Sequence, residues 1–113
     1  MKAKQEPQNP RIIVVQKLYG YNLNKDSEII FPKHRFKKFI KDVVNGTIER
    51  ADLIENLINN ELKEYINKNK TELIVKIMLM AAIYEFMYMH KTPIKVVISE
   101  YLKVSDSFID DSQ

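Results

Sequence analysis

A nearly continuous apolar run between Glu72 and Met89 constrains the fold of this chain more than any other feature. Its apolar residues would occupy every side of a helix: Leu73, Ile74, Val75, Ile77, Met78, Leu79, Met80, Ala81, Ala82 and Ile83. A membrane span is one interpretation, but Lys76 and Glu85 interrupt the run, and it is barely long enough to cross a bilayer. We therefore expect a central helix that the other helices surround, with its methionines filling the core.

The next segment, TPIKVVISE (residues 92–100), has the β-branched residues of a strand, but strand alternation fails at Val97. A longer window shows apolar residues at helical spacing, with one polar member: Ile94, Val97, Ile98, Tyr101, Leu102, Ser105 and Phe108. Thr92 suits an N-cap, and Pro93 suits the first helical position, where its missing N–H costs nothing. The pattern predicts a helix with Val97 and Ile98 in the core and Lys95 exposed.

The rest of the chain also indicates helices. Asn9 and Pro10 begin the first, a loop of about ten residues covers 24–32, and a second helix starts at about Lys33. Ala51–Ile66 is amphipathic, with residues 68–70 as a connector and Thr71 as the next N-cap. Two glycines and four prolines are too few for a many-turned β architecture. We predict one all-α domain over residues 1–113, a compact bundle of about five to six helices, with residues 1–8 as a mobile arm.

Charge is distributed unevenly along the chain. The net charge of +3 combines +6 over residues 1–50 with −3 over residues 51–113, and all three arginines lie in the basic part. This division fits one face for a polyanion, although a merely solvated surface explains it equally well. The chain has no cysteine and no apolar N-terminal stretch of signal-peptide type, so we expect no export and a cytoplasmic location.

The sequence offers little for catalysis. His34 and His90 lie in different segments without metal-ligand spacing, and Asp110 and Asp111 are adjacent, so they would point in different directions on a helix. No nucleophile is paired with a base. We expect no enzyme activity, no metal and no cofactor.

Binding of single-stranded RNA has more support. Lys2, Lys4 and Arg11 could contact phosphates, and Tyr19, two turns along the same helix, could stack on an unpaired base. Tyr19 could equally belong to the core. A second basic cluster, Lys33–Lys41, is typical of a solvated helix face.

Several motifs resemble the NusB family of transcription antitermination factors over most of the chain. Residues 82–86 (AIYEF) and 92–100 (TPIKVVISE) look like the family's LYEL…VPxKVxINE signature with the spacer length kept. Residues 15–19 (VQKLY) resemble its VQALY, and residues 41–46 (KDVVNG) resemble its xDLLxGV. Ser107–Phe108 followed by residues 110–112 (DDS) is similar to SF…EDSHKFVNG. Together these motifs are specific.

The resemblance implies two small helical subdomains and a non-enzymatic function. The family binds the boxA element of ribosomal RNA operons together with NusE, a small-subunit ribosomal protein, and the complex helps RNA polymerase read through terminators. Family RNA contacts carry over to Arg11, Tyr19 and Asp111, and less firmly to Gln16. Lys95 is an additional candidate because it is expected to be exposed.

The chain departs from the family pattern in its N-terminal arm and at its C-terminal end, and each departure leads to a prediction. The arm lacks most of the family's arginines, which predicts weak RNA binding by the chain alone, and Val75 replaces an expected charged contact to NusE. The sequence also stops inside the family's final helix motif, which predicts exposed apolar surface, reduced stability or self-association, including a possible homodimer. Two rival interpretations stay open: the RNA-binding domain of a ribosomal RNA methyltransferase, and a helical adaptor that binds only protein.

Overall fold

Within the residues that the structure describes, five α-helices and one short π-helix form the fold. The computed structural model describes residues 8–61 and 73–111, with side chains through Phe108. The elements follow in the order α1 (Pro10–Leu23), α2 (Lys37–Glu49), α3 (Ala51–Glu61), α4 (Leu73–Tyr84), the π-helix η1 (Glu85–Met89) and α5 (Ile94–Asp111). No strand occurs among the described residues, so the expected all-α class is confirmed.

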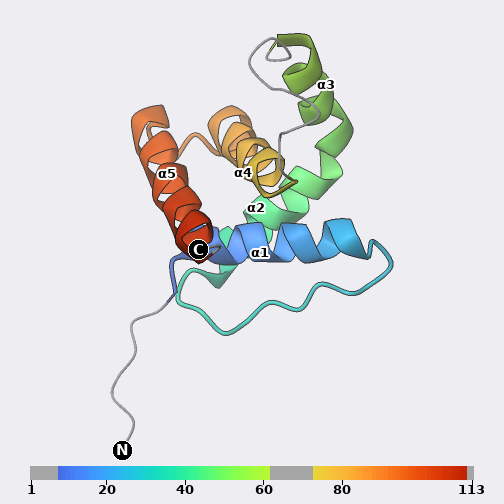
Figure 1. Cartoon of the computed structure of the whole chain (residues 1–113), viewed down its shortest axis with the longest axis vertical. Helices are drawn as coiled ribbons and strands as arrows, with labels where there is room; N and C mark the ends of the chain where they lie inside the picture. The colour runs from blue at the N-terminus through green and yellow to red at the C-terminus, as the bar shows by residue number, and fades with distance from the viewer. Residues whose placement is uncertain (1–7, 62–72, 112–113) are drawn as a thin grey trace, which may run out of the picture.

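The first helix serves as the base of the fold. Figure 1 shows α1 crossing near the ends of α4 and α5, while α2 lies behind it and leads into α3. Each of α2, α4 and α5 contacts α1, and α4 also contacts α2, α3 and α5. The segment between α1 and α2 runs back along α1 (Figure 1), and α5 also contacts α1.

The boundaries of α1 follow from local hydrogen bonds. Asn9 is the N-cap, its Oδ1 accepting from the Arg11 backbone N–H at 2.8 Å, and Pro10 occupies the first helical position as predicted. Asn24 ends the helix in an extended conformation. Its side chain then accepts from the Asp26 N–H at 3.1 Å, a local turn that competes with further helix.

The second helix starts later than predicted, at Lys37 instead of about Lys33. His34 Nδ1 accepts from the Phe36 backbone N–H at 3.0 Å, so this part of the chain forms a turn that precedes the helix. Arg50 alone joins α2 to α3: its N–H donates to the Gly46 carbonyl at 3.0 Å, and its carbonyl accepts from Ile54 at 2.9 Å.

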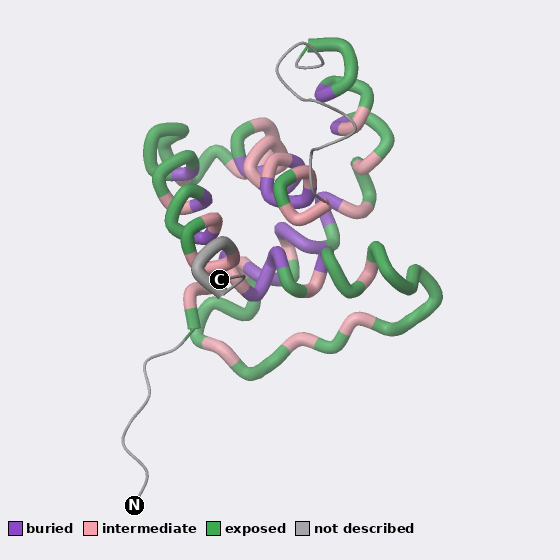
Figure 2. The backbone as a smooth tube through the Cα atoms, viewed as in Figure 1, coloured by how far each residue is buried: buried purple, intermediate pink, exposed green. Residues whose placement is uncertain are grey.

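The main core lies where α1, α2, α4 and α5 meet. Figure 2 shows the buried residues gathered on the facing sides of these helices and exposed residues along the outer face of α5. β-Branched side chains fill this core at an exposed fraction of 0–1%: Val14, Val15, Ile40, Val43, Val44, Val97 and Val104. Such side chains let the helices approach closely, which favours dense packing.

A second, smaller core holds α3 against α4. Ile54, Ile58 and Met80 form it, and an ion pair between Lys76 Nζ and Glu55 Oε2 at 2.6 Å lies beside it. The stripe predicted for Ala51–Ile66 is therefore confirmed at Ile54 and Ile58, whereas Leu57 is exposed. The remaining predictions for this region, which concern residues 62–71, lie outside the described residues.

The apolar run forms a central helix as expected, but not a uniform one. Ile77 and Ala81 are buried, whereas Val75 and Phe86 are exposed by 46% and 52%. The α-helix ends at Tyr84 and continues as π-helix to Met89, which shortens the predicted helix of residues 72–89. Among the described helices, none is both long enough and apolar enough to cross a membrane.

TPIKVVISE is the start of a helix, not a strand. The Pro93 carbonyl accepts from the N–H groups of Val96 and Val97 at 2.9 and 3.0 Å, so α5 begins at Ile94, one residue later than predicted. Val97 is buried as expected. The prediction that Ile98 fills the core is wrong, because its side chain is 51% exposed. The buried stripe of α5 instead runs through Val97, Tyr101 and Val104.

Candidate nucleic-acid interface

The guanidinium of Arg11 lies inside the fold rather than on its surface. Arg11 Nη2 and Nε donate to the two carboxylate oxygens of Glu85 at 2.6 and 2.9 Å. The Tyr101 hydroxyl donates to the same carboxylate at 2.7 Å. Arg11 is 9% exposed and Glu85 is 2% exposed. The side chain of Arg11, which the sequence analysis predicted to contact phosphate, thus lies against a buried carboxylate in this structure.

Aromatic rings enclose this ion pair. The Arg11 guanidinium carbon lies 4.9 Å from the centre of the Phe39 ring and 5.7 Å from that of Tyr101. The rings and the bidentate carboxylate together compensate the desolvation of a buried charge. Since Arg11 is on α1, Phe39 on α2, Glu85 on η1 and Tyr101 on α5, the pair fixes four elements relative to one another.

The same contacts shift the ionisation of two groups. Burial would lower the pKa of Arg11, but the hydrogen bond and charge of Glu85 more than offset it, and the pKa is raised overall. Burial raises the pKa of Tyr101 well above its ordinary value, and the neighbouring carboxylate of Glu85 raises it further. Arg11 therefore stays charged and Tyr101 stays neutral over the physiological range.

Glu85 lies on the buried face of the central helix, four residues after the buried Ala81, and it begins the π-helix. The His90 N–H donates to the Glu85 carbonyl five residues earlier at 3.4 Å, and His90 adopts a left-handed conformation with φ of 55°. Glu85, at the start of this wider turn, is buried, whereas Phe86 beside it is exposed.

An exposed face of α1 holds two of the predicted RNA contacts. Tyr19 is 37% exposed, and Gln16, one turn before it, is also exposed. Tyr19 lines an open hollow of about 290 Å³ with Leu73, Ile74 and Phe108. Its ring is therefore partly accessible beside an apolar surface, which is the setting in which an unpaired base can stack.

A neighbouring hollow of about 320 Å³ lies between α1 and the segment before α2. Gln16 and Lys17 line it from α1, and Ser27, Glu28 and Ile29 line it from the other side. Gln16 thus lies between this hollow and the Tyr19 ring. Its amide can both donate and accept hydrogen bonds, as a contact to a base edge requires.

The other predicted site residues either lie farther from the Tyr19 region or fall wholly or partly outside the described residues. Helix α5 ends at Asp111, three residues beyond Phe108, so its backbone reaches the Tyr19 region, while its side chain lies outside the described part. Lys2 and Lys4 lie outside the described residues. Lys95 is exposed at the opposite end of α5, about 24 Å from Asp111 at 1.5 Å per residue. The structure therefore separates Lys95 from the α1 face.

A third surface feature lies between α4 and α5. Val75 and Leu79 face Ile98 and Leu102 across an apolar groove of about 270 Å³. Ile98 and Leu102 are 51% and 62% exposed. An apolar groove between two helices is typical of a surface that binds another protein.

Sequence analysis missed the partners of Arg11. Glu85 was noticed only as a charge that argues against a membrane span, and Tyr101 only as one member of an apolar stripe. A lone carboxylate in an apolar run requires a buried cation, so Glu85 itself could have indicated the pair. No group of three or more His, Asp or Glu side chains that could hold a metal comes together in the described part of the chain.

Comparison with known proteins identifies the class to which this fold belongs. The model of the NusB family matches residues 8–113, and the chain belongs to this family. Proteins named transcription antitermination protein NusB are similar to it. The one from Bradyrhizobium diazoefficiens is 32% identical over 72 residues, covering 64% of this chain and 44% of that protein.

Two further relatives have the same name. The protein from Lysinibacillus sphaericus is 31% identical over 74 residues, covering 66% of this chain and 58% of its own length. The protein from Sphingopyxis alaskensis is 27% identical over 126 aligned positions, covering 96% and 85%. The matches to the first two span about half of each relative. No solved structure matches the chain.

Proposed function

We propose that this chain acts as a transcription antitermination factor that binds boxA RNA of ribosomal RNA operons together with NusE and promotes read-through by RNA polymerase. Membership of the NusB family and the names of its relatives support the general function. The observation that supports RNA binding most directly is the exposed Tyr19 ring, with Gln16 beside it and the end of α5 nearby.

In this proposal the predicted site residues have different functions. Tyr19 stacks on a base, and Gln16 hydrogen-bonds a base edge. Asp111 hydrogen-bonds a base or orients a neighbouring group, since its negative charge cannot neutralise phosphate. Lys2 and Lys4 contribute phosphate contacts from the arm. Arg11 acts from inside, by holding α1 in position through Glu85.

The groove between α4 and α5 is the surface we assign to the protein partner. Val75, which occupies a position where a charged contact to NusE was expected, is one of its exposed apolar residues. An apolar contact would then replace a charged one at this position. The exposed Ile98 and Leu102 could also support a homodimer, which sedimentation measurements with and without NusE would distinguish.

The test is RNA binding, measured by fluorescence anisotropy with a boxA RNA, with and without NusE, at two salt concentrations. We expect weak binding by the chain alone and tighter binding with NusE, with the affinity falling as salt increases. Tyr19→Ala should weaken binding roughly tenfold, whereas Tyr19→Phe, the matched control, should retain it because the ring remains.

Two outcomes favour the rival interpretations. If the wild type fails to bind RNA with or without NusE, while NusE binding persists, the chain is a protein-binding adaptor. The apolar groove is the specific observation that supports this second candidate. If the complete reading frame encodes a catalytic domain downstream, the chain is the RNA-binding part of a methyltransferase.

A further inference from the structure

The segment before α2 and the start of α2 together form a strongly basic stretch that contains an exposed aromatic ring. Residues 29–41 contain four lysines, one arginine and no acidic residue. Lys33, Arg35 and Lys37 are exposed, and the Phe36 side chain between them is 48% exposed. The sequence alone suggested the solvated face of a helix. In the structure residues 33–36 precede the helix, so this reason for treating the cluster as ordinary surface does not apply to them.

Phe36 is held in place by its neighbours instead of being buried in the core. The Arg35 guanidinium carbon lies 5.1 Å from the centre of the Phe36 ring, and the His34 ring centre lies 5.9 Å away. The Phe36 backbone N–H donates to His34 Nδ1. A fixed ring beside an arginine is the combination on which bases of single-stranded RNA stack.

His34 also ties this segment to the start of the first helix. Since its Nδ1 accepts a hydrogen bond, its Nε2 carries the proton and donates to the Gln8 carbonyl at 2.6 Å. Gln8 directly precedes Asn9, the N-cap of α1. The basic segment is thereby fixed beside the N-terminal end of α1.

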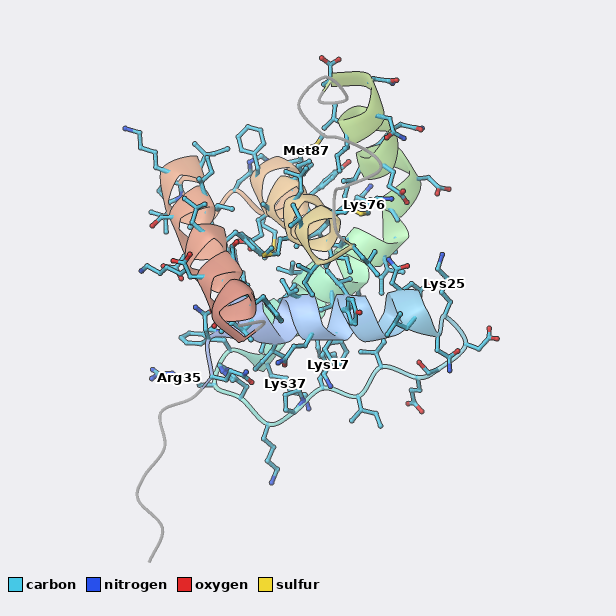
Figure 3. The ribbon with its side chains drawn as sticks, in the orientation of Figure 1. Lys17, Lys25, Arg35, Lys37, Lys76 and Met87 are labelled. Atoms are coloured by element: carbon cyan, nitrogen blue, oxygen red, sulfur yellow. The ribbon has the colours of Figure 1, made fainter. Side chains whose placement is uncertain are left out.

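The cations of this segment continue toward the α1 face. In the view of Figure 3, Arg35, Lys37 and Lys17 follow one another along the edge below α1. Lys17 also lines the hollow shared with Gln16. The row formed by Lys33, Arg35, Phe36, Lys37 and Lys17, here termed the basic edge, therefore ends at the hollow that Gln16 also lines.

We propose that the basic edge is a second RNA subsite, which binds the single-stranded RNA flanking the segment bound at Tyr19. Lys33, Arg35, Lys37 and Lys17 neutralise successive phosphates, and Phe36 with Arg35 provides a stacking surface for one base. Lys38 contributes less, because its Nζ is paired with Asp42 Oδ2 at 3.0 Å. This inference rests on the proposed RNA-binding function, since it extends the same site.

The edge also accounts for a feature of the arm. The expected arginines before α1 are mostly missing, and Arg11 is committed to Glu85. The exposed cations of the basic edge lie beside the same end of α1 through the His34–Gln8 contact. They can therefore supply phosphate contacts there without a longer basic arm.

The experiment compares three RNAs and two charge-matched variants, in the presence of NusE. One RNA has the boxA core length, and the others extend it by about six to eight uridines at the 5′ or the 3′ end. The edge variant is Lys33→Gln/Arg35→Gln/Lys37→Gln. The control variant is Lys25→Gln/Lys91→Gln/Lys103→Gln, which removes the same charge from the turn after α1, from the segment after η1 and from α5.

For wild type, we expect at least one extension to tighten binding by about tenfold. The edge variant should lose this gain, and its log–log salt slope on the extended RNA should fall by about 2, since three contacts at 0.7 each are removed. The control variant should keep the gain and most of the slope. Phe36→Ala should weaken binding of the extended RNA several-fold, and Phe36→Leu should not restore it, because leucine has no π-face.

Failure of this inference is distinguishable from failure of the proposed function. If wild type binds no RNA of either length, the proposed function is overturned. If wild type binds the core RNA but neither extension tightens binding, only the second subsite is overturned. Equal losses in the edge and control variants would also overturn it, because they would show a general effect of net charge.

Discussion

Arg11 and Arg35 each lie beside a phenylalanine ring, but Arg11 is buried and Arg35 is exposed. Each guanidinium lies about 5 Å from a phenylalanine ring, at 4.9 Å for Arg11 over Phe39 and 5.1 Å for Arg35 over Phe36. Arg11 is buried against a carboxylate, whereas Arg35 is exposed in a segment without acids. The comparison shows that an arginine beside an aromatic ring does not by itself define a nucleic-acid site. The presence of a buried anion decides whether its charge is available.

The largest expected effect comes from breaking the buried pair. Glu85→Gln leaves the Arg11 charge desolvated and without its counter-charge, so we expect the free energy of unfolding to fall by about 3–5 kcal/mol. The measurement is urea denaturation followed by circular dichroism. The matched control is Asp42→Asn, which breaks the exposed pair with Lys38 and should cost less than about 1 kcal/mol. Similar losses for both variants would contradict a structural function for Arg11.

Like the two arginines, the two glycines differ in burial: Gly46 is buried and Gly20 is exposed. A Cβ at Gly46, which is buried in α2, would overlap the Tyr84 ring, so Gly46→Ala should destabilise the fold by about 1–3 kcal/mol. Nothing lies within 4 Å of a Cβ at Gly20, which is exposed inside α1. Gly20→Ala should therefore stabilise by about 0.5–1 kcal/mol. Thermal melting of the two variants measures both signs, and stabilisation by Gly46→Ala would show that Tyr84 moves aside freely.

Alkaline pH should lower the stability of the fold through Tyr101, whose hydroxyl lies in the buried cluster with Arg11 and Glu85. The pKa of Tyr101 is raised in the folded state by burial and by Glu85, so the fold binds the tyrosine proton more tightly than the unfolded chain does. Its stabilising contribution is complete below pH about 10 and is lost above it, by up to about 1.4 kcal/mol per pH unit. Tyr101→Phe should show a shallower decline than wild type in urea melts at pH 8–11. Parallel declines would contradict a raised pKa at this tyrosine.

The smallest effect is expected at the exposed arginine. Arg35→Ala removes a cation–π contact at an exposed position, so the free energy of unfolding should change by no more than about 1 kcal/mol. Arg35→Lys is the control, since it keeps the charge while changing the planar group. Urea denaturation of both variants provides the measurement. A loss comparable to that of Glu85→Gln would mean that Arg35 is a structural residue as well.

Periodicity predicted most of the helices because apolar spacing and end signals agreed. Asn9 and Pro10 fixed the start of α1, and the stripe through Val97 and Tyr101 outweighed the strand propensity of TPIKVVISE. Local competition was harder to predict. The His34 ring captures the Phe36 N–H and delays α2, an effect that apolar spacing does not reveal.

The site was less predictable because it depends on contacts between distant segments. Arg11 and Glu85 are 74 residues apart, and the spacing within each helix gives no sign of their pairing. Ile98 satisfied the helical pattern but lies on the side of α5 that no described helix covers. The exposure of Tyr19 depends likewise on how α4 and α5 approach α1.

The most direct test of the difference between the two arginines is an NMR titration of the ¹⁵N-labelled chain with single-stranded boxA RNA. We expect the amide resonances of Gln16, Tyr19, Arg35 and Phe36 to shift, together with the Arg35 side-chain Nε–H. The Arg11 Nε–H should stay in place and remain protected from solvent exchange by Glu85. A shifted, rapidly exchanging Arg11 Nε–H beside an unperturbed basic edge would contradict the assignment of Arg11 to the core and of Arg35 to the RNA.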